Sequence, residues 1–277
     1  MSKITLSLLI LSLCVCPMVP AATIRVDPNQ VVNASFLGVG AEYDPFNYMP
    51  EGIRRGYNDA YNEWEMLLVS RMALRFARMH FQPDWFMKGW GVYDFDSPRM
   101  QAVYRYLDTL QASGTFASLT YGWKISREAQ DWYGFADPNV NPKESAPRDL
   151  DGYAAGASEL INHLINVKKY TNVKFLTSYN EPDGGDFDLP PGMYPALGSG
   201  PPYLDQAYYY VQLMLKMHQK LVADGRRGLV QIWGPEETDK HIWTEFVANS
   251  ECHKFWDLYT GHCYPHLAIA DPGAGQI

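Results

Sequence analysis

The feature that most constrains the fold of this chain is a regular alternation between short β-rich runs and longer segments of helical periodicity. The β-rich runs cover residues 36–43, 74–81, 116–121, 173–179, 229–233 and 255–262. The helical segments lie between them and cover residues 58–72, 98–111, 149–169, 204–222 and 240–248. This alternation predicts an α/β fold in which a parallel sheet carries helices on its outside. A doubly wound sheet and a (β/α)8 barrel both satisfy the pattern.

The residues at the strand ends favour the barrel. No Gly-x-Gly-x-x-Gly phosphate loop follows the first run, and polar or aromatic residues close nearly every run. In a barrel, the carboxyl ends of all strands together form the active face. A complete barrel has eight strands, and six can be traced here. We therefore expect a (β/α)8 TIM barrel truncated after about six βα units, whose open edges favour aggregation of the isolated segment.

The N-terminus has the pattern of an export signal. Lys3 precedes an apolar run over residues 4–16, and Ala21 supplies a small residue for cleavage. We expect residues 1–21 to be a signal peptide, residues 22–277 to be the barrel domain, and the product to be secreted or periplasmic. A lipid anchor at Cys14 is a minor alternative, because Leu13 stands where a small residue is expected.

Charge and composition narrow the possible partners. The chain has 23 Lys and Arg against 31 Asp and Glu, a net charge of −8. An acidic surface repels phosphate backbones and anionic lipids, so neither nucleic acid nor a membrane is expected as a partner. Cys252 and Cys263 remain after removal of the signal, and a single disulfide between them is left open. Together with His253, His262 and His266 they fit no zinc template, so we predict no metal and no cofactor.

The most informative local motif is Ser-Tyr-Asn-Glu-Pro-Asp-Gly at residues 178–184. The apolar run before it delivers the amide of Asn180 and the carboxyl group of Glu181 side by side, and Pro182 stops further strand pairing. A carboxyl group held among aromatic residues is desolvated, which favours its protonated form. Glu181 is therefore suited to act as a general acid.

Asn-Glu-Pro at the end of the fourth strand resembles the clan A glycoside hydrolases, most closely families 5 and 39. Three further features agree with this resemblance. Arg78 ends the second strand, Gly234-Pro235 ends the fifth, and His262-Cys263-Tyr264 ends the sixth. The resemblance covers residues 36–264, which is nearly all of the chain after the signal.

The resemblance implies a role for each matched residue. Glu181 would protonate the glycosidic oxygen and later deprotonate the water that releases the sugar. Asn180 would hydrogen-bond the sugar 2-hydroxyl, while Arg78 and Tyr264 would orient the nucleophile and His262 would line the same wall. In this clan the nucleophile is a Glu at the end of the seventh strand. We expect it after the last residue of this chain.

Other side chains near the strand ends are weaker candidates. Glu237 is expected to contact substrate and Glu236 to be solvated in a loop, while a nucleophile from this fifth strand remains a minor alternative. Trp123, together with the loop residues Trp85 and Trp90, is a candidate platform for stacking on sugar rings.

These observations predict a secreted retaining glycoside hydrolase of the cellulase type, which cleaves β-linked oligo- or polysaccharides. We expect a monomer when the protein is full length and no activity from this segment alone. Transglycosylation is a related alternative. The main competitor is an inactive glycan-binding barrel that lacks the nucleophile, and an unrelated α/β oxidoreductase is disfavoured because no phosphate loop is present.

Overall fold

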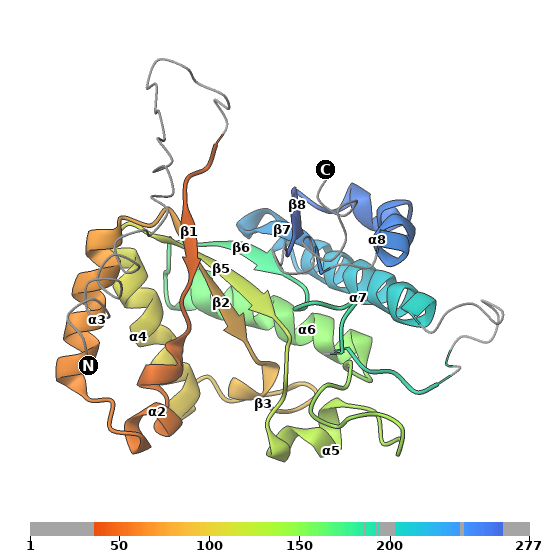
Figure 1. The fold of residues 1–277 in the computed structure, drawn as a ribbon, viewed down its shortest axis with the longest axis horizontal. Helices are drawn as coiled ribbons and strands as arrows, with labels where there is room; N and C mark the ends of the chain where they lie inside the picture. The colour runs from red at the N-terminus through yellow and green to blue at the C-terminus, as the bar shows by residue number, and fades with distance from the viewer. Residues whose placement is uncertain (1–35, 186, 192, 194–202, 239–240, 263–277) are drawn as a thin grey trace, which may run out of the picture. The chain divides into compact units, whose positions relative to one another are not determined.

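In the part of the chain that the structure describes, six parallel strands form the main sheet, and their spatial order follows their order in the chain (Figure 1). From one edge to the other they are β1 (Gly40–Glu42), β2 (Phe76–Phe81), β5 (Phe116–Tyr121), β6 (Val173–Thr177), β7 (Gln231–Glu237) and β8 (Leu258–Gly261). A doubly wound sheet reverses direction at a switch point, whereas a barrel advances steadily from strand to strand. The sheet is therefore an open half-barrel, and the predicted α/β fold of a partial TIM barrel is confirmed.

The structure is a computed structural model that describes residues 36–262 except residues 186, 192, 194–202 and 239–240. The described residues from Gly38 onward belong to one compact unit. The predicted signal peptide, Cys263, Tyr264 and His266 lie outside the described residues. No helix in the described part of the chain is long and apolar enough to span a membrane.

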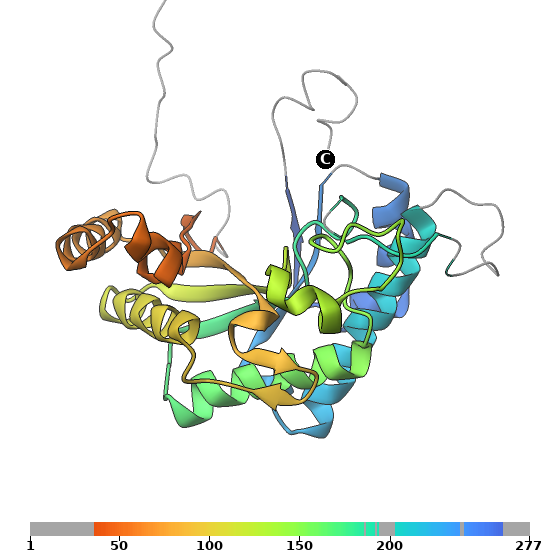
Figure 2. The same cartoon turned by 90° about the horizontal axis from the view of Figure 1, so that it is seen from below.

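Helices follow the strands, as the periodicity predicts. The longer ones are α3 (Asp59–Met72), α4 (Pro98–Ala112), α6 (Leu150–Ile161), α7 (Tyr203–Ala223) and α8 (His241–Ala248). Asn58, Ser97 and Asp149 cap the first turns of α3, α4 and α6, because each side-chain oxygen accepts from a backbone N–H of that turn. Neighbouring helices pack together, α3 on α4, α6 on α7 and α7 on α8. Figure 2 shows α6 and α7 along the outer side of the sheet.

Several short elements occupy the connections between strands and helices. They are α2 (Pro50–Arg54), α5 (Gln130–Tyr133), the antiparallel hairpin of β3 (Met87–Gly89) and β4 (Val92–Tyr93), 3-10 turns at Pro45–Tyr48, Pro83–Trp85, Arg127–Ala129, Arg227–Leu229 and Glu251–Lys254, and a π-helical turn at Asn162–Val167. The π-helical turn lies inside the helical segment predicted over residues 149–169, and the other short elements are not predicted by the sequence pattern. Each is too short to establish a hydrophobic period of its own.

Successive side chains of β2 point to opposite faces of the sheet, so that one face belongs to the core and the other to the site. Ala77, Met79 and Phe81 are fully buried on the face that packs against the helices. Arg78 and His80 have the opposite parity and therefore share the inner face. This alternation places a charged pair on the inside of the half-barrel, at the carboxyl end of a strand that is otherwise apolar.

An aromatic layer lies on the inner face beneath these polar residues. The rings of Phe175 and Trp233 stack with their centroids 4.1 Å apart, and Phe76 meets Trp233 edge-on at 5.8 Å. Phe76 precedes Arg78 by two residues, so the same face of β2 changes from aromatic to charged within one pleat. The inner face of the sheet therefore carries aromatic side chains in the middle of the strands and polar side chains toward their carboxyl ends.

The fifth strand of the sheet is longer than predicted. We expect it to end at Trp233, but β7 continues to Glu237. It does so because β8 pairs with it throughout, with Pro235 opposite Thr260 and Glu237 opposite Gly261. The register shifts between these two pairs, which leaves Glu236 as a bulged residue with a φ of +62°. A bulge re-aims a side chain that regular pleating would direct elsewhere.

Candidate active site

A cavity of about 440 Å3 opens at the carboxyl ends of the strands. It is lined by Glu42, Arg78, His80, Trp123, Asn180, Glu181 and His262. These residues come from β1, from β2 and from the segments directly after β5, β6 and β8. Convergence of strand ends on one concave polar site is the arrangement expected for a barrel active face.

Arg78 connects three of the strand ends. Its guanidinium donates to Glu42 at 3.1 Å, to the Asn180 amide oxygen at 2.7 Å and to Glu236 at 2.6 Å. The Arg78 side chain is 18% exposed and that of Glu236 only 5%. Because a fixed guanidinium fork holds several acceptors at once, Arg78 determines the relative placement of these groups.

His262 lies between two carboxylates. Its Nδ1 is 2.7 Å from Glu181 Oε1, and its Nε2 is 3.0 Å from Glu236 Oε2. Burial acts to lower the pKa of His262, but the hydrogen bonds and negative charge of Glu236 and Glu181 outweigh it and raise that pKa. Burial acts to raise the pKa of Glu236, but the His262 hydrogen bond and the Arg78 charge outweigh it and lower that pKa. Both acids therefore favour the charged form of the ring.

His80 is a part of the site that the sequence analysis did not select. Its Nε2 is 3.2 Å from the Asn180 amide oxygen, its backbone N–H donates to Asp44 at 2.7 Å, and its ring lies 4.6 Å from that of Trp123. The signal for it is present in the sequence, because His80 follows Arg78 by two residues and so shares its face.

One cluster in the site has the donor types of a metal centre. Ligand atoms of Glu42, Asp44 and His80 lie within 4.8 Å of one another. The Arg78 guanidinium, however, contacts both Glu42 and the His80 ring at 3.1 Å. A cation is therefore already supplied by the protein at this point, and the arrangement fits a hydrogen-bonded network better than an ion site.

Gly122 positions two of the lining residues. It follows β5 with a φ of +115°, and a β-carbon there would collide with Tyr153 and Tyr179. Its carbonyl accepts from the backbone N–H of Asn180 at 3.0 Å, which joins the end of β5 to the end of β6. A side chain at this position would therefore displace Trp123 and Asn180 together.

The backbone at both acids that contact His262 is strained. Glu181 has a φ of +42° and Glu236 a φ of +62°, a region that residues with a β-carbon seldom occupy. Each such residue costs roughly 1–2 kcal/mol and persists only where surrounding contacts enforce it. Strain of this kind concentrates at functional sites, and here it occurs at the two carboxylates that contact His262.

Five of the predicted site residues come together in this cavity. They are Arg78, Trp123, Asn180, Glu181 and His262. The predicted Tyr264 lies outside the described residues. Glu237 is not among the described residues that line the cavity, and its carboxylate accepts a hydrogen bond from the Tyr259 hydroxyl at 3.1 Å. Its predicted contact with substrate, like the roles of the other residues, stays a prediction.

Two expectations about individual side chains are wrong. Glu236 is 4% exposed rather than solvated in a loop, because the β7 bulge turns it inward onto Arg78 and His262. Trp85 is 2% exposed and cannot stack on a sugar, because its ring packs against Phe81. Position in a connecting loop does not imply exposure when the loop folds back on the core.

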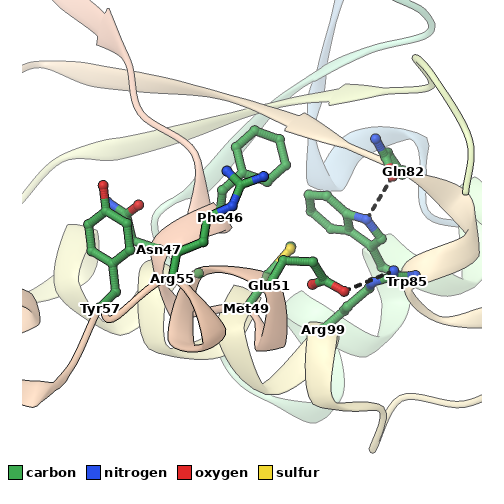
Figure 3. Close-up of a pocket in the computed structure, with 10 residues that line it drawn as sticks. Phe46, Asn47, Met49, Glu51, Arg55, Tyr57, Gln82, Trp85 and Arg99 are labelled. Carbon is green, nitrogen blue, oxygen red and sulfur yellow. Dashed lines mark hydrogen bonds and ion pairs between the residues drawn. The ribbon is translucent and has the colours of Figure 1, made fainter.

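A second cavity of about 290 Å3 lies beside α2 and the segment after β2 (Figure 3). Glu51 and Arg99 form an ion pair in its wall at 3.5 Å, and the Trp85 indole donates to the Gln82 side chain at 3.0 Å. Four of its lining residues are thus paired with one another, and the lining comes mainly from helices and loops. We therefore place the candidate active site at the larger cavity.

Comparison with known proteins gives a relationship at the level of fold. No protein-family model matches the sequence, and no curated protein sequence shows significant similarity to it. A family 39 glycoside hydrolase from Bacteroides cellulosilyticus WH2 aligns over 82% of this chain and 38% of its own, with a TM-score of 0.51 and 13% identity. The likeness to clan A glycoside hydrolases predicted from the strand-end motifs is confirmed for the fold.

Two further solved structures align with lower TM-scores. The family 53 catalytic domain from Ignisphaera aggregans covers 89% of this chain and 64% of its own, with a TM-score of 0.49 and 14% identity. The exo-beta-1,4-mannosidase from Opitutaceae bacterium strain TAV5 covers 73% of this chain and 32% of its own, with a TM-score of 0.46 and 16% identity. The chain thus spans about a third of the mannosidase and less than two thirds of the family 53 domain.

Proposed function

We propose that this chain carries the acid/base part of a retaining glycoside hydrolase site that acts on β-linked sugars. The observation that carries the proposal is the position of Glu181. Its side chain is 22% exposed in the wall of the strand-end cavity, beside Asn180 and in hydrogen-bond contact with His262. A carboxyl group with access to the cavity and a protonatable neighbour is equipped to give and take one proton.

In the proposed mechanism, Glu181 in its acid form protonates the oxygen of the scissile glycosidic bond as the leaving sugar departs. The resulting carboxylate then removes a proton from the water that hydrolyses the glycosyl-enzyme. Asn180, whose amide oxygen is held by Arg78, donates from Nδ2 to the sugar 2-hydroxyl. Trp123 offers its ring to the apolar face of a sugar.

The second carboxylate of this mechanism is proposed to come from outside the described residues. A retaining enzyme holds its two carboxyl groups about 5 Å apart, with the nucleophile open to the anomeric carbon. Glu236 does not suit that role, since it is 4% exposed, paired with Arg78 and absent from the described cavity wall. A nucleophile must reach the substrate, whereas Glu236 is enclosed by protein.

A glycan-binding barrel without turnover is the second candidate. It is favoured by the ion pairing of Glu42 and Glu236, because Arg78 contacts both of these carboxylates. In that case the cavity binds β-linked oligosaccharides and releases them unchanged. Export of the protein and a monomeric state belong to the same proposal.

The test uses the natural full-length protein that contains this chain. Wild type, Glu181→Gln and the surface control Glu251→Gln are assayed on β-linked oligosaccharides, and the anomer of the first product is identified by NMR. We expect retained configuration, a loss of roughly 10²–10⁴-fold in kcat for Glu181→Gln, and no change for the control. Full activity of Glu181→Gln would refute the acid/base role, and binding without turnover in wild type would favour the second candidate.

A further inference from the structure

Glu236 is a buried acid that the proposed mechanism does not use. It occupies the bulge in β7 with a φ of +62°, and its side chain is 5% exposed. Arg78 Nη2 donates to it at 2.6 Å, and His262 Nε2 lies 3.0 Å from it. Burying a carboxylate is costly unless it is paired and hydrogen-bonded, and both partners favour its charged form.

The contacts of His262 fit two protonation states, and which of them holds depends on whether Glu181 is ionised or protonated. A neutral imidazole has one N–H and one lone pair, so it can donate to only one of two carboxylates. His262 has Glu181 on Nδ1 and Glu236 on Nε2, at 2.7 and 3.0 Å. Only the imidazolium satisfies both contacts as a donor. Among the described residues, Arg78 is a positive group that faces the ring, 3.4 Å from Nε2, and it opposes this charge while also pairing with Glu236.

We infer that Glu236 is a positioning residue that keeps a proton on His262 and directs that ring toward Glu181, so that the Glu236–His262–Glu181 array stores the proton used in catalysis. This inference rests on the proposed role of Glu181. Transfer of the proton from His262 Nδ1 to Glu181 Oε1 breaks one N–H bond and forms one O–H bond. It leaves a neutral ring with its remaining proton on Nε2, donated to Glu236.

Glu236 makes both states of the array possible. Before the transfer, the Glu236 carboxylate balances the charge of the imidazolium. After the transfer, it accepts a hydrogen bond from the Nε2–H of the neutral ring and so fixes the tautomer of that ring. The raised pKa of His262 and the lowered pKa of Glu236 agree with this arrangement. The array is assembled from β7 and from the segments after β6 and β8, and a carboxylate that only filled space would not need the aligned Nε2 contact.

The first measurement reads His262 directly and does not depend on activity. The imidazole Cε1–Hε1 signals of the full-length protein are followed by NMR over pH 4–9 in wild type, Glu236→Gln and Glu251→Gln. Glu251 is an exposed acid paired with Lys254, so its variant repeats the chemical change away from the site. We expect the His262 midpoint to fall by about one pH unit or more in Glu236→Gln and to stay in place in the control.

The second measurement is the pH profile of kcat for the same three proteins. In Glu236→Gln, we expect one limb of the pH profile to move toward acid pH by the same amount as the NMR midpoint of His262 moves. In Glu251→Gln, we expect that limb to stay where it is in wild type. A merely structural role would lower activity without moving the limb. An unchanged His262 midpoint in Glu236→Gln would overturn the inference.

Two outcomes remain interpretable if a variant or the proposed function fails. If Glu236→Gln does not fold, wild type alone decides, because a His262 midpoint below that of the exposed His253 overturns the inference and one above it supports it. If Glu181→Gln retains full activity, the proposed function fails. A displaced His262 midpoint would then still establish the coupling between Glu236 and His262, while the storage of a catalytic proton would be refuted.

Discussion

Replacing Arg78 with Met would leave the buried Glu236 without its guanidinium. Arg78 is 18% exposed and donates to Glu236 at 2.6 Å and to Asn180 at 2.7 Å. Removing one partner of a buried ion pair costs about 3–5 kcal/mol, because the other charge remains desolvated. His262 continues to pair with Glu236, so we place the loss of unfolding free energy for Arg78→Met at the low end, about 3 kcal/mol at pH 7.

Urea unfolding followed by tryptophan fluorescence measures this loss. The double variant Arg78→Met/Glu236→Met removes both charges, and we expect it to be more stable than Arg78→Met by about 2 kcal/mol. The loss should shrink at acid pH, since Glu236 without Arg78 is protonated more readily and then carries no charge to desolvate. Arg78→Met within about 1 kcal/mol of wild type, or losses in the double variant that simply add, would refute the buried ion pair.

Three further outcomes are expected. The stability difference between wild type and Glu236→Gln should be greatest between pH 4.5 and 6.5, as thermal unfolding across pH would check. The Glu236 carboxylate stabilises the fold above pH 4.5, and this contribution is lost as pH falls through its lowered pKa. The His262 imidazolium stabilises the fold below pH 6.5, and this contribution is lost as pH rises through its raised pKa. Gly122→Ala should destabilise by roughly 2–4 kcal/mol in urea unfolding, because it combines strain at a φ of +115° with collision against Tyr179. Trp123→Ala should weaken oligosaccharide binding by about 1 kcal/mol or more in calorimetry while leaving the fold intact, and unchanged affinity would exclude stacking at this ring.

The strand and helix pattern was predictable because it is local. Apolar alternation and helical periodicity act over a few residues, and the caps at Asn58, Ser97 and Asp149 lie beside the helices that they begin. The position of polar residues at strand ends was equally visible, since parallel strands meet at one edge. For this reason five predicted site residues come together in one cavity.

The errors occur where a side chain depends on partners far away in the sequence. Trp85 stands in a connection and looks available, but it is buried, and its ring meets edge-on that of Phe46, which precedes β2 in the chain. Glu236 stands beside Glu237 in an unremarkable acidic pair. Only the register shift against β8 gives the two neighbours different surroundings, one inside the half-barrel and one beside Tyr259.

The sequence by itself determined the α/β alternation and the chemistry offered at the strand ends, because both arise from short-range periodicity and from residue types. The tertiary structure alone decided which of those groups touch. Arg78 contacts Asn180 102 residues away and Glu236 158 residues away. Such contacts form only when all the intervening strands have paired in register, so no local pattern carries them. The protonation of His262 follows from this pairing, because it depends on two carboxylates that only the assembled sheet brings to the same ring.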